Sequence, residues 1–136
     1  MAWTEITTKD IAIQGEDFKY NCMASGTIKK GQALVNITDG DTSDIYVISS
    51  SLATSTKFVG VAVTDAVKGE PVAVYGQGAI CWGRGDSALT YGDYLIADDD
   101  GQFDDVASET ETAASGVAQA MNTIGSAGEF KLKIIR

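Results

Sequence analysis

The stretch from Phe58 to Gly78 limits most strongly what this chain can fold into. Valine recurs at every second position on both sides of a central break, which is the two-residue period of a half-buried β-strand. The break itself, Lys68-Gly69-Glu70-Pro71, suits a tight turn because glycine accepts a positive φ and proline fixes φ. The stretch therefore predicts two strands joined by a short turn.

Short runs of Val, Ile and Ala separated by glycine continue along the chain, which has 136 residues, 15 Gly and one Pro. Such spacing is typical of an all-β protein with many tight turns and bulges. A single domain of this length buries about two-thirds of its unfolded surface. We expect an N-terminal arm or first strand over residues 1–9 and a single β-barrel domain over residues 10–136.

Other segments predict the remaining elements of this β domain. A loop is expected over residues 49–56, and a mobile loop over the acidic residues 104–115. The expected strands and turns are a hairpin over 10–24, a strand after Gly31, a strand over 45–48, a turn and strand over 89–97, a hairpin turn over 98–101, and strands over 116–121 and 129–135.

Two short motifs occur twice in the same order. Gly31-Gln-Ala-Leu-Val35 is similar to Gly92-Asp-Tyr-Leu-Ile96, and Gly60-Val-Ala62 is similar to Gly116-Val-Ala118. In each half a glycine turn begins a strand, and a Gly-Val-Ala strand follows it. This order predicts a degenerate internal duplication of glycine-turn and strand units that closes a small barrel.

The charge balance excludes several classes of partner. With 10 basic and 19 acidic residues, the net charge is −9, which opposes binding to nucleic acid and to an anionic membrane surface.

The first residues lack the basic start and apolar core of a signal peptide, and no apolar run is long enough to span a bilayer. We expect the chain to be made in the cytoplasm and kept inside the cell until some larger event releases it.

Catalytic chemistry has little support in the sequence. The absence of His removes Ser-His and Cys-His nucleophile systems and most metal sites. The Asp-rich segment 98–105 departs from the EF-hand pattern, and Gly83-Arg-Gly-Asp86 suits a turn better than an integrin ligand. We expect no enzymatic activity and no catalytic, cofactor-binding or metal-binding residues, and we expect Cys22 and Cys81 to be reduced and buried.

Four glycine-centred motifs give the chain a resemblance to a known family. In order, they span residues 28–35, 58–78, 89–101 and 115–136. Together they resemble the family of small phage capsid cement, or head decoration, proteins, formerly known as a domain of unknown function and sometimes mislabelled as a predicted recombinase. The resemblance covers residues 26–136, and this chain departs from it in the insert over 38–56 and in its Trp-bearing start.

The resemblance implies a β-barrel or β-tulip domain that forms a homotrimer. It also implies a virion protein that binds the major capsid protein on the outer surface of an icosahedral tailed-phage head, where capsid subunits meet, and stabilises the expanded shell. An N-terminal arm could add a strand to a capsid sheet. The expected capsid contacts are Trp3, Thr4, Ile6 and Thr7, and the expected oligomer interface contains Trp82, Tyr91 and Tyr94.

Two alternatives belong to other functional classes. A β-sandwich binding module of a tail fibre or cell surface would share the strand pattern. A biotinyl or lipoyl carrier domain would share the hairpin around Gly31, but Asn122 stands where a carrier needs its modified Lys. A covalently attached cofactor would add mass to the intact chain, and co-sedimentation with capsids would separate decoration from fibre modules.

Overall fold

The computed structural model describes residues 3, 6, 11–14, 19–36, 47–49, 58–97, 101–106 and 116–135, and all regular elements within them are β-strands. The expected all-β fold is therefore confirmed. The strands are β1 (Ala12–Gln14), β2 (Lys19–Ala24), β3 (Ala33–Asn36), β4 (Val47–Ser49), β5 (Phe58–Ala62), β6 (Pro71–Tyr75), β7 (Ile80–Gly85), β8 (Tyr94–Ala97), β9 (Phe103–Asp105), β10 (Ala118–Ala120) and β11 (Gly128–Ile134).

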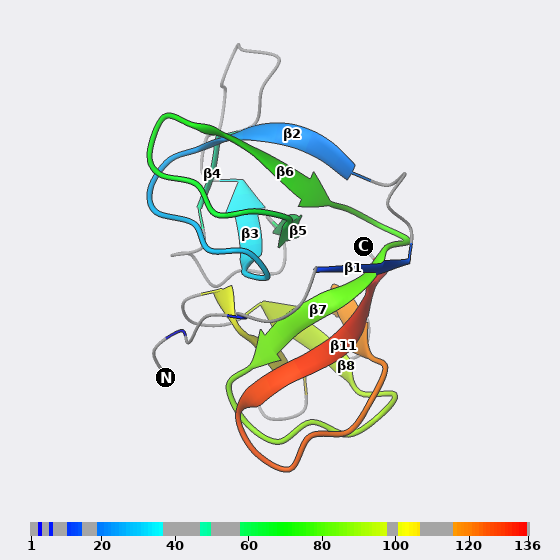
Figure 1. Ribbon diagram of the computed structural model, residues 1–136. Helices are drawn as coiled ribbons and strands as arrows, with labels where there is room; N and C mark the ends of the chain where they lie inside the picture. Colours follow the sequence, from blue (N-terminus) through cyan, green and yellow to red (C-terminus); the bar gives the residue numbers. More distant parts are fainter. Residues whose placement is uncertain are drawn as a thin grey trace.

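The strands form two lobes, one above the other in Figure 1. The first lobe is a closed barrel in the order β2-β4-β3-β5-β6, in which only the β2–β4 pair is parallel. The expected hairpin in the stretch 58–78 is present, because β5 and β6 pair antiparallel through Val61↔Tyr75 and Ala62↔Val74.

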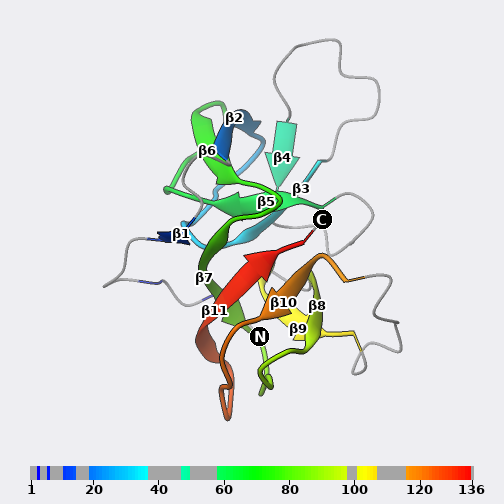
Figure 2. The ribbon, with the colours of Figure 1, turned by 90° about the vertical axis from the view of Figure 1, so that its right-hand side faces the viewer.

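The second lobe repeats this arrangement. Its sheet runs β7-β11-β10-β8-β9, and a parallel pair between β9 and β7 at Gly85↔Phe103 joins the two ends. β1 pairs with the other half of β7 and crosses the molecule between the lobes (Figure 1). Figure 2 shows β7, β11, β10 and β8 lying together in the lower lobe.

The pairing pattern confirms the internal duplication and corrects its register. Strand pairs match one for one: Cys22↔Val72 in the first lobe corresponds to Gly83↔Phe130 in the second. The turn amides correspond as well, since Gly31 N–H donates to Ala62 O at 2.8 Å and Gly92 N–H to Ala120 O at 2.9 Å.

The two Gly-Val-Ala motifs are therefore offset by two residues from structural equivalence. The structural partner of Gly60 is Ala118, because Leu34 pairs with Gly60 and the corresponding Leu95 pairs with Ala118. A shift of two residues keeps every side chain on the same face of a strand. The sequence match thus found the correct strands but not the correct register, and each half of the chain closes its own ring of strands.

The two barrels divide side-chain volume differently between two paired strands. The first barrel has Cys22 opposite Val72, whereas the second has Gly83 opposite the larger Phe130. A Cβ added at Gly83 would lie 2.5 Å from Leu132 Cδ2 and 3.2 Å from Phe103 Cε2. Close packing explains this pattern, because bulk added on one strand requires space on its neighbour.

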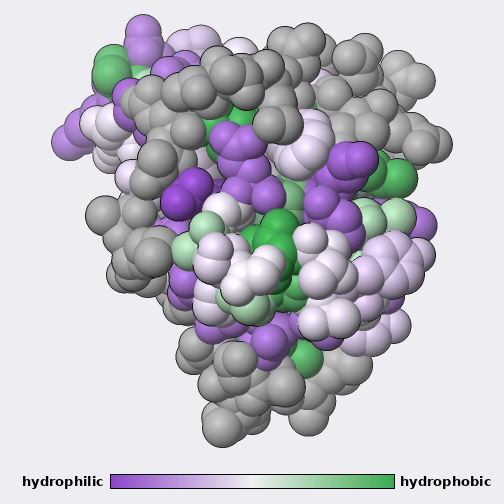
Figure 3. All heavy atoms as spheres, turned by 60° about the horizontal axis from the view of Figure 1, so that its bottom comes forward, coloured by the Kyte–Doolittle hydropathy of each residue, from purple (hydrophilic) through white to green (hydrophobic). Residues whose placement is uncertain are grey.

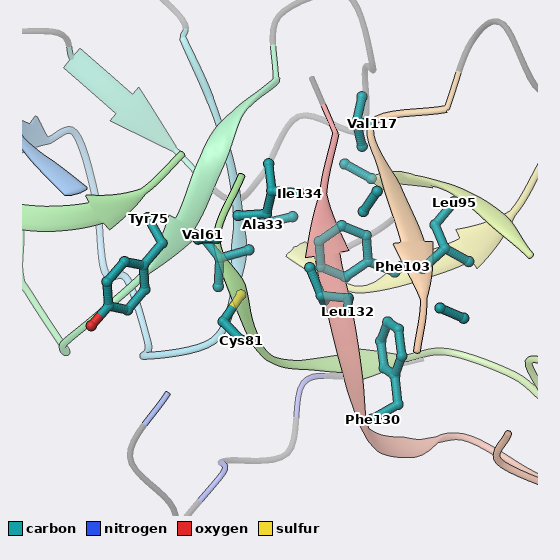
Figure 4. Close-up of a cluster of buried hydrophobic side chains, with 14 of the residues drawn as sticks. Ala33, Val61, Tyr75, Cys81, Leu95, Phe103, Val117, Phe130, Leu132 and Ile134 are labelled. Carbon is teal, nitrogen blue, oxygen red and sulfur yellow. The ribbon is translucent and has the colours of Figure 1, made fainter. Parts of the chain in front are cut away.

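A shared cluster of buried side chains joins the lobes. From the first lobe it contains Ala33, Val61 and Tyr75, which are at most 4% exposed, and Figure 4 shows them beside the side chains of the second lobe. The rings of Phe58 and Phe103 also meet edge to face at 6.2 Å. β5 was expected to be half-buried, but both its faces are covered at Val61 and Ala62 because the second lobe lies against the outer one.

Three local expectations were wrong. Residues 10–24 form no hairpin, because β1 pairs with β7 while β2 pairs with β4 and β6. Residues 83–85 extend β7 instead of forming a turn, because each pairs with β11. Residues 104–105 belong to β9, which pairs with β8, and residues 107–115 of the expected mobile loop lie outside the described residues.

Candidate functional site

The three residues expected at an oligomer interface lie in the second barrel, with Trp82 on β7, Tyr94 on β8 and Tyr91 in the turn that precedes β8. One row of paired residues crosses four strands of the outer face of this barrel: Ile80 on β7 pairs with Lys133 on β11, Lys133 with Gln119 on β10, and Gln119 with Tyr94 on β8. Apart from Asp93, their sequence neighbours are buried, so alternation along each strand directs these four side chains outward. Trp82 and Tyr94 both face outward, on β7 and β8, and β11 and β10 lie between these two strands.

A second part of the same face is basic. Trp82 pairs with Lys131 across the β7–β11 ladder, and Lys131 Nζ lies 5.6 Å from the centroid of the Trp82 ring, within range of a cation–π interaction. The next pair along the ladder is Arg84 with Glu129. We call this surface the aromatic–basic face, and it comprises Ile80, Trp82, Arg84, Tyr91, Tyr94, Gln119, Glu129, Lys131 and Lys133.

Tyr91 lies at the tip of a turn that is held by side chains. Asp93 Oδ2 accepts a hydrogen bond from Thr90 N–H at 2.9 Å, and Thr123 Oγ1 accepts one from Tyr91 N–H at 3.0 Å. Gln119 Nε2 donates to Gly92 O at 3.1 Å, and Gly92 has the positive φ of 92° that the turn requires. These bonds fix the backbone at Tyr91, whose side chain is 66% exposed.

The equivalent face of the first barrel has a different role. Ala33, Val61 and Tyr75 occupy the positions of Tyr94, Gln119 and Lys133, respectively, in the matched strand pairs. The first three are buried between the lobes, whereas Tyr94 is 40% exposed and Lys133 is exposed. Duplication therefore left one copy of this face covered inside the molecule and the other copy open.

The residues expected to contact a capsid lie partly in the core. Ile6 is fully buried, and its Cδ1 lies 2.5 Å from the point where a Cβ on Gly31 would stand. Trp3 is partly buried and packs against the same cluster. Thr4 and Thr7 lie outside the described residues.

The described residues offer little reactive chemistry. Both cysteines are free and buried, as expected, and burial raises the pKa of the Cys22 thiol to about 11 and that of the Cys81 thiol to about 12. Among these residues no group of three or more His, Cys, Asp or Glu side chains is arranged to hold a metal ion. The part of the chain that the structure describes also contains no helix long and apolar enough to cross a membrane.

Comparison with known proteins yields a likeness of fold. No family model and no curated protein matches the sequence. Among solved structures, the chain is similar to the head fiber gp8.5 N base of bacteriophage phi29, with a TM-score of 0.63 and 23% sequence identity over 85% of this chain and 92% of that one. The likeness shows that the two proteins share a fold.

The sequence prediction of the site missed its basic residues. Lys131 and Lys133 alternate with apolar residues in β11, so the sequence did indicate that they face solvent. The position of Lys131 beside Trp82 depends on the pairing of β7 with β11, and Lys133 is linked to Tyr94 only through Gln119 on β10. No local pattern in the sequence reports such pairing.

Proposed function

We propose that this chain is a structural protein associated with the head of a bacteriophage. The observation that carries the proposal is the fold likeness to a protein described as part of a phage head fiber, which extends over most of both chains. The four ordered glycine motifs, which resemble those of head decoration proteins, support the same class independently.

The finer form of the proposal is a capsid decoration protein without enzymatic activity. It would bind the major capsid protein as a homotrimer on the outer surface of the head, where subunits meet, and stabilise the expanded shell. Such a role needs a rigid scaffold and complementary surfaces rather than reactive groups. The two strand rings with a shared core supply such a scaffold, and both cysteines are buried, which raises the pKa of their thiols.

The position of Ile6 modifies the proposed contact through the N-terminal arm. Because Ile6 is part of the core, its side chain would have to leave the domain to anchor a capsid. We therefore propose that residues 1–9 contact the shell mainly through side chains other than Ile6, such as Thr4 and Thr7. Deleting residues 1–9 would remove core packing together with the arm, so substitutions are the cleaner test.

A second candidate is a fibre module, and one observation favours it. The similar protein is described as the base of a head fiber rather than as a cement protein. In this reading the chain would connect a fibre to the head and would occupy few positions on it. The two functions differ in copy number and in their effect on the shell.

The experiment is to mix the purified chain with heads of the phage that encodes it, prepared without the chain. Co-sedimentation and electron cryo-microscopy would measure binding and position, and thermal disruption of the heads would measure stabilisation. Many copies on the outer surface and a higher disruption temperature would support decoration, while few copies with an unchanged temperature would support a fibre base. Absence of the chain from both heads and fibres would contradict both functions.

The arm is tested in the same assay with Thr4→Glu and Thr7→Glu, which retain Ile6. The matched control is Thr64→Glu, which adds the same charge at an exposed position of the first barrel. Weaker sedimentation with heads for the arm variants alone is the expected result. Equal binding by all three variants would remove the arm from the proposal.

A further inference from the structure

We propose that the aromatic–basic face binds the acidic surface of a second copy of this chain, in a salt-sensitive head-to-tail contact. The inference deepens the homotrimer of the proposed function by assigning its surface and mode of contact. It concerns the isolated chain and does not require a capsid.

Charge is the first argument. The face contains Arg84, Lys131 and Lys133 and one carboxylate, Glu129, which stands opposite Arg84 in the β-ladder, while Asp93 lies at its edge in the turn between Tyr91 and Tyr94. Removing the four charged residues of the face from the totals leaves 7 basic and 18 acidic residues (10 − 3 and 19 − 1) for the rest of the chain. The rest of the chain therefore carries a net charge of −11 (7 − 18), opposite in sign to that of the face, and such complementarity steers association.

Composition is the second argument. Among the described residues, the exposed large hydrophobic side chains are Val67, Tyr91 and Tyr94, and two of the three belong to this face. Tyr, Trp and Arg are the residues enriched where protein surfaces bind one another. Figure 3 shows the end of the second barrel, where green apolar spheres lie among white and purple ones.

The fold itself provides the third argument. The equivalent face of the first barrel, at Ala33 and Val61, is already buried in an intramolecular contact with the second barrel. The same strands in the second barrel offer a surface of the same backbone shape, with Tyr94 and Gln119 at those positions. Polar and aromatic replacements suit a contact that is exposed in the monomer, whereas the apolar originals suit a permanent one.

Charge also selects the symmetry of the contact. A twofold contact of this face with itself would bring Lys131 and Lys133 of one copy near the same residues of the other, and like charges at an interface are costly. A head-to-tail contact avoids that repulsion and closes into a ring when the rotation between copies permits. A trimer is the ring expected from the proposed function.

The test measures the mass of the purified full chain by light scattering and sedimentation velocity over a range of concentrations. Measurements at ~0.01 M and ~1 M salt compare Debye lengths of about 30 Å and about 3 Å. We expect oligomers at low salt and monomers at high salt. The double variant Lys131→Glu/Lys133→Glu should weaken association by about tenfold or more at low salt, and Tyr94→Ala should weaken it at both salt concentrations.

The matched control is Lys30→Glu/Lys68→Glu, which changes the net charge equally in the first barrel. Circular dichroism and urea unfolding verify that each variant folds. A monomer at every salt and concentration would overturn the proposal, as would equal dissociation by the control and the face variants. If the face variants lose self-association but still bind heads, the face proposal stands separately from the capsid contact. If they associate normally, the face proposal fails whether or not the chain binds heads.

Discussion

Ala33 and Tyr94 occupy the same position in the two halves of the chain, yet Ala33 is 1% exposed and Tyr94 is 40% exposed. The backbone around them is the same, since each lies two residues after a positive-φ glycine whose N–H closes a turn on the neighbouring strand. The difference arises because the second lobe covers the first copy of the face and nothing in the described chain covers the second.

This relationship predicts opposite effects for two substitutions that exchange the residues. Ala33→Tyr should lower the free energy of unfolding by about 1–3 kcal/mol or more, because the ring has no space between the lobes. Tyr94→Ala should change it by less than ~1 kcal/mol, because the side chain lies largely in water. Urea unfolding of both variants measures the difference, and similar losses at the two positions would contradict the assignment of the buried face.

Gly83 on β7 leaves space for the large side chains packed beside it, so a side chain added at Gly83 should destabilise the fold. Gly83→Ala places a methyl group 2.5 Å from Leu132 Cδ2, so we expect a loss of about 1–3 kcal/mol of unfolding free energy. Gly125→Ala is the control, because a Cβ there meets nothing within 4 Å. The urea midpoint should fall for Gly83→Ala with the m-value unchanged, and a fall as large for Gly125→Ala would point to a general effect of removing glycine.

The two turn-capping side chains predict another asymmetry between the halves. Gln32 Oε1 accepts a hydrogen bond from Lys29 N–H at 2.8 Å, and Asp93 Oδ2 accepts the equivalent bond from Thr90 N–H at 2.9 Å. Gln32 is 6% exposed and lies against Gly101 of the second lobe, whereas Asp93 is more accessible.

Gln32→Glu should therefore destabilise the fold by more than ~1 kcal/mol at pH 7, because it places a carboxylate in the contact between lobes. Asp93→Asn removes a charge at a more solvated site and should cost less than ~1 kcal/mol. Thermal unfolding at pH 7 and pH 4 measures both, and the Gln32→Glu loss should shrink at pH 4 as the carboxyl becomes protonated. A loss that is independent of pH would show that shape, not charge, is responsible.

The buried thiols predict falling stability at alkaline pH. The pKa of each thiol is raised from 9.0, to about 11 for Cys22 and about 12 for Cys81, so the folded state retains protons that the unfolded state releases. Below pH 9 both states are protonated and the thiols contribute no pH dependence. Between pH 9 and about 11, each thiol lowers the unfolding free energy by at most ~1.4 kcal/mol per pH unit.

Comparison with Cys22→Ala and Cys81→Ala isolates this contribution from Lys and Tyr titration. The variants should show a shallower decline of the urea midpoint from pH 9 to 11. A thiol reagent should label both cysteines only in denaturant, and rapid labelling of the folded chain at pH 8 would contradict their burial.

Elements that depend only on neighbours along the chain could be predicted from the residues. Valines at every second position on both sides of the Gly69-Glu70-Pro71 turn predicted the β5–β6 hairpin, because strand alternation is a local requirement. The repeated glycine turns predicted the β3 and β8 strands, because a positive φ is also a local requirement. The internal duplication was also visible, although its register was displaced by two residues, since a two-residue shift preserves the inward and outward pattern.

The surfaces that meet are set by the packing of the whole fold. β1 pairs with β7 rather than with β2, and Val61 is buried on the outer face of its barrel because a second barrel lies there. Trp82 meets Lys131, and Tyr94 meets Gln119, only because β7 pairs with β11 and β8 pairs with β10. These outcomes depend on pairing between residues distant in the chain, which is set by the free energy of the whole packed core and has no expression in any short stretch of sequence.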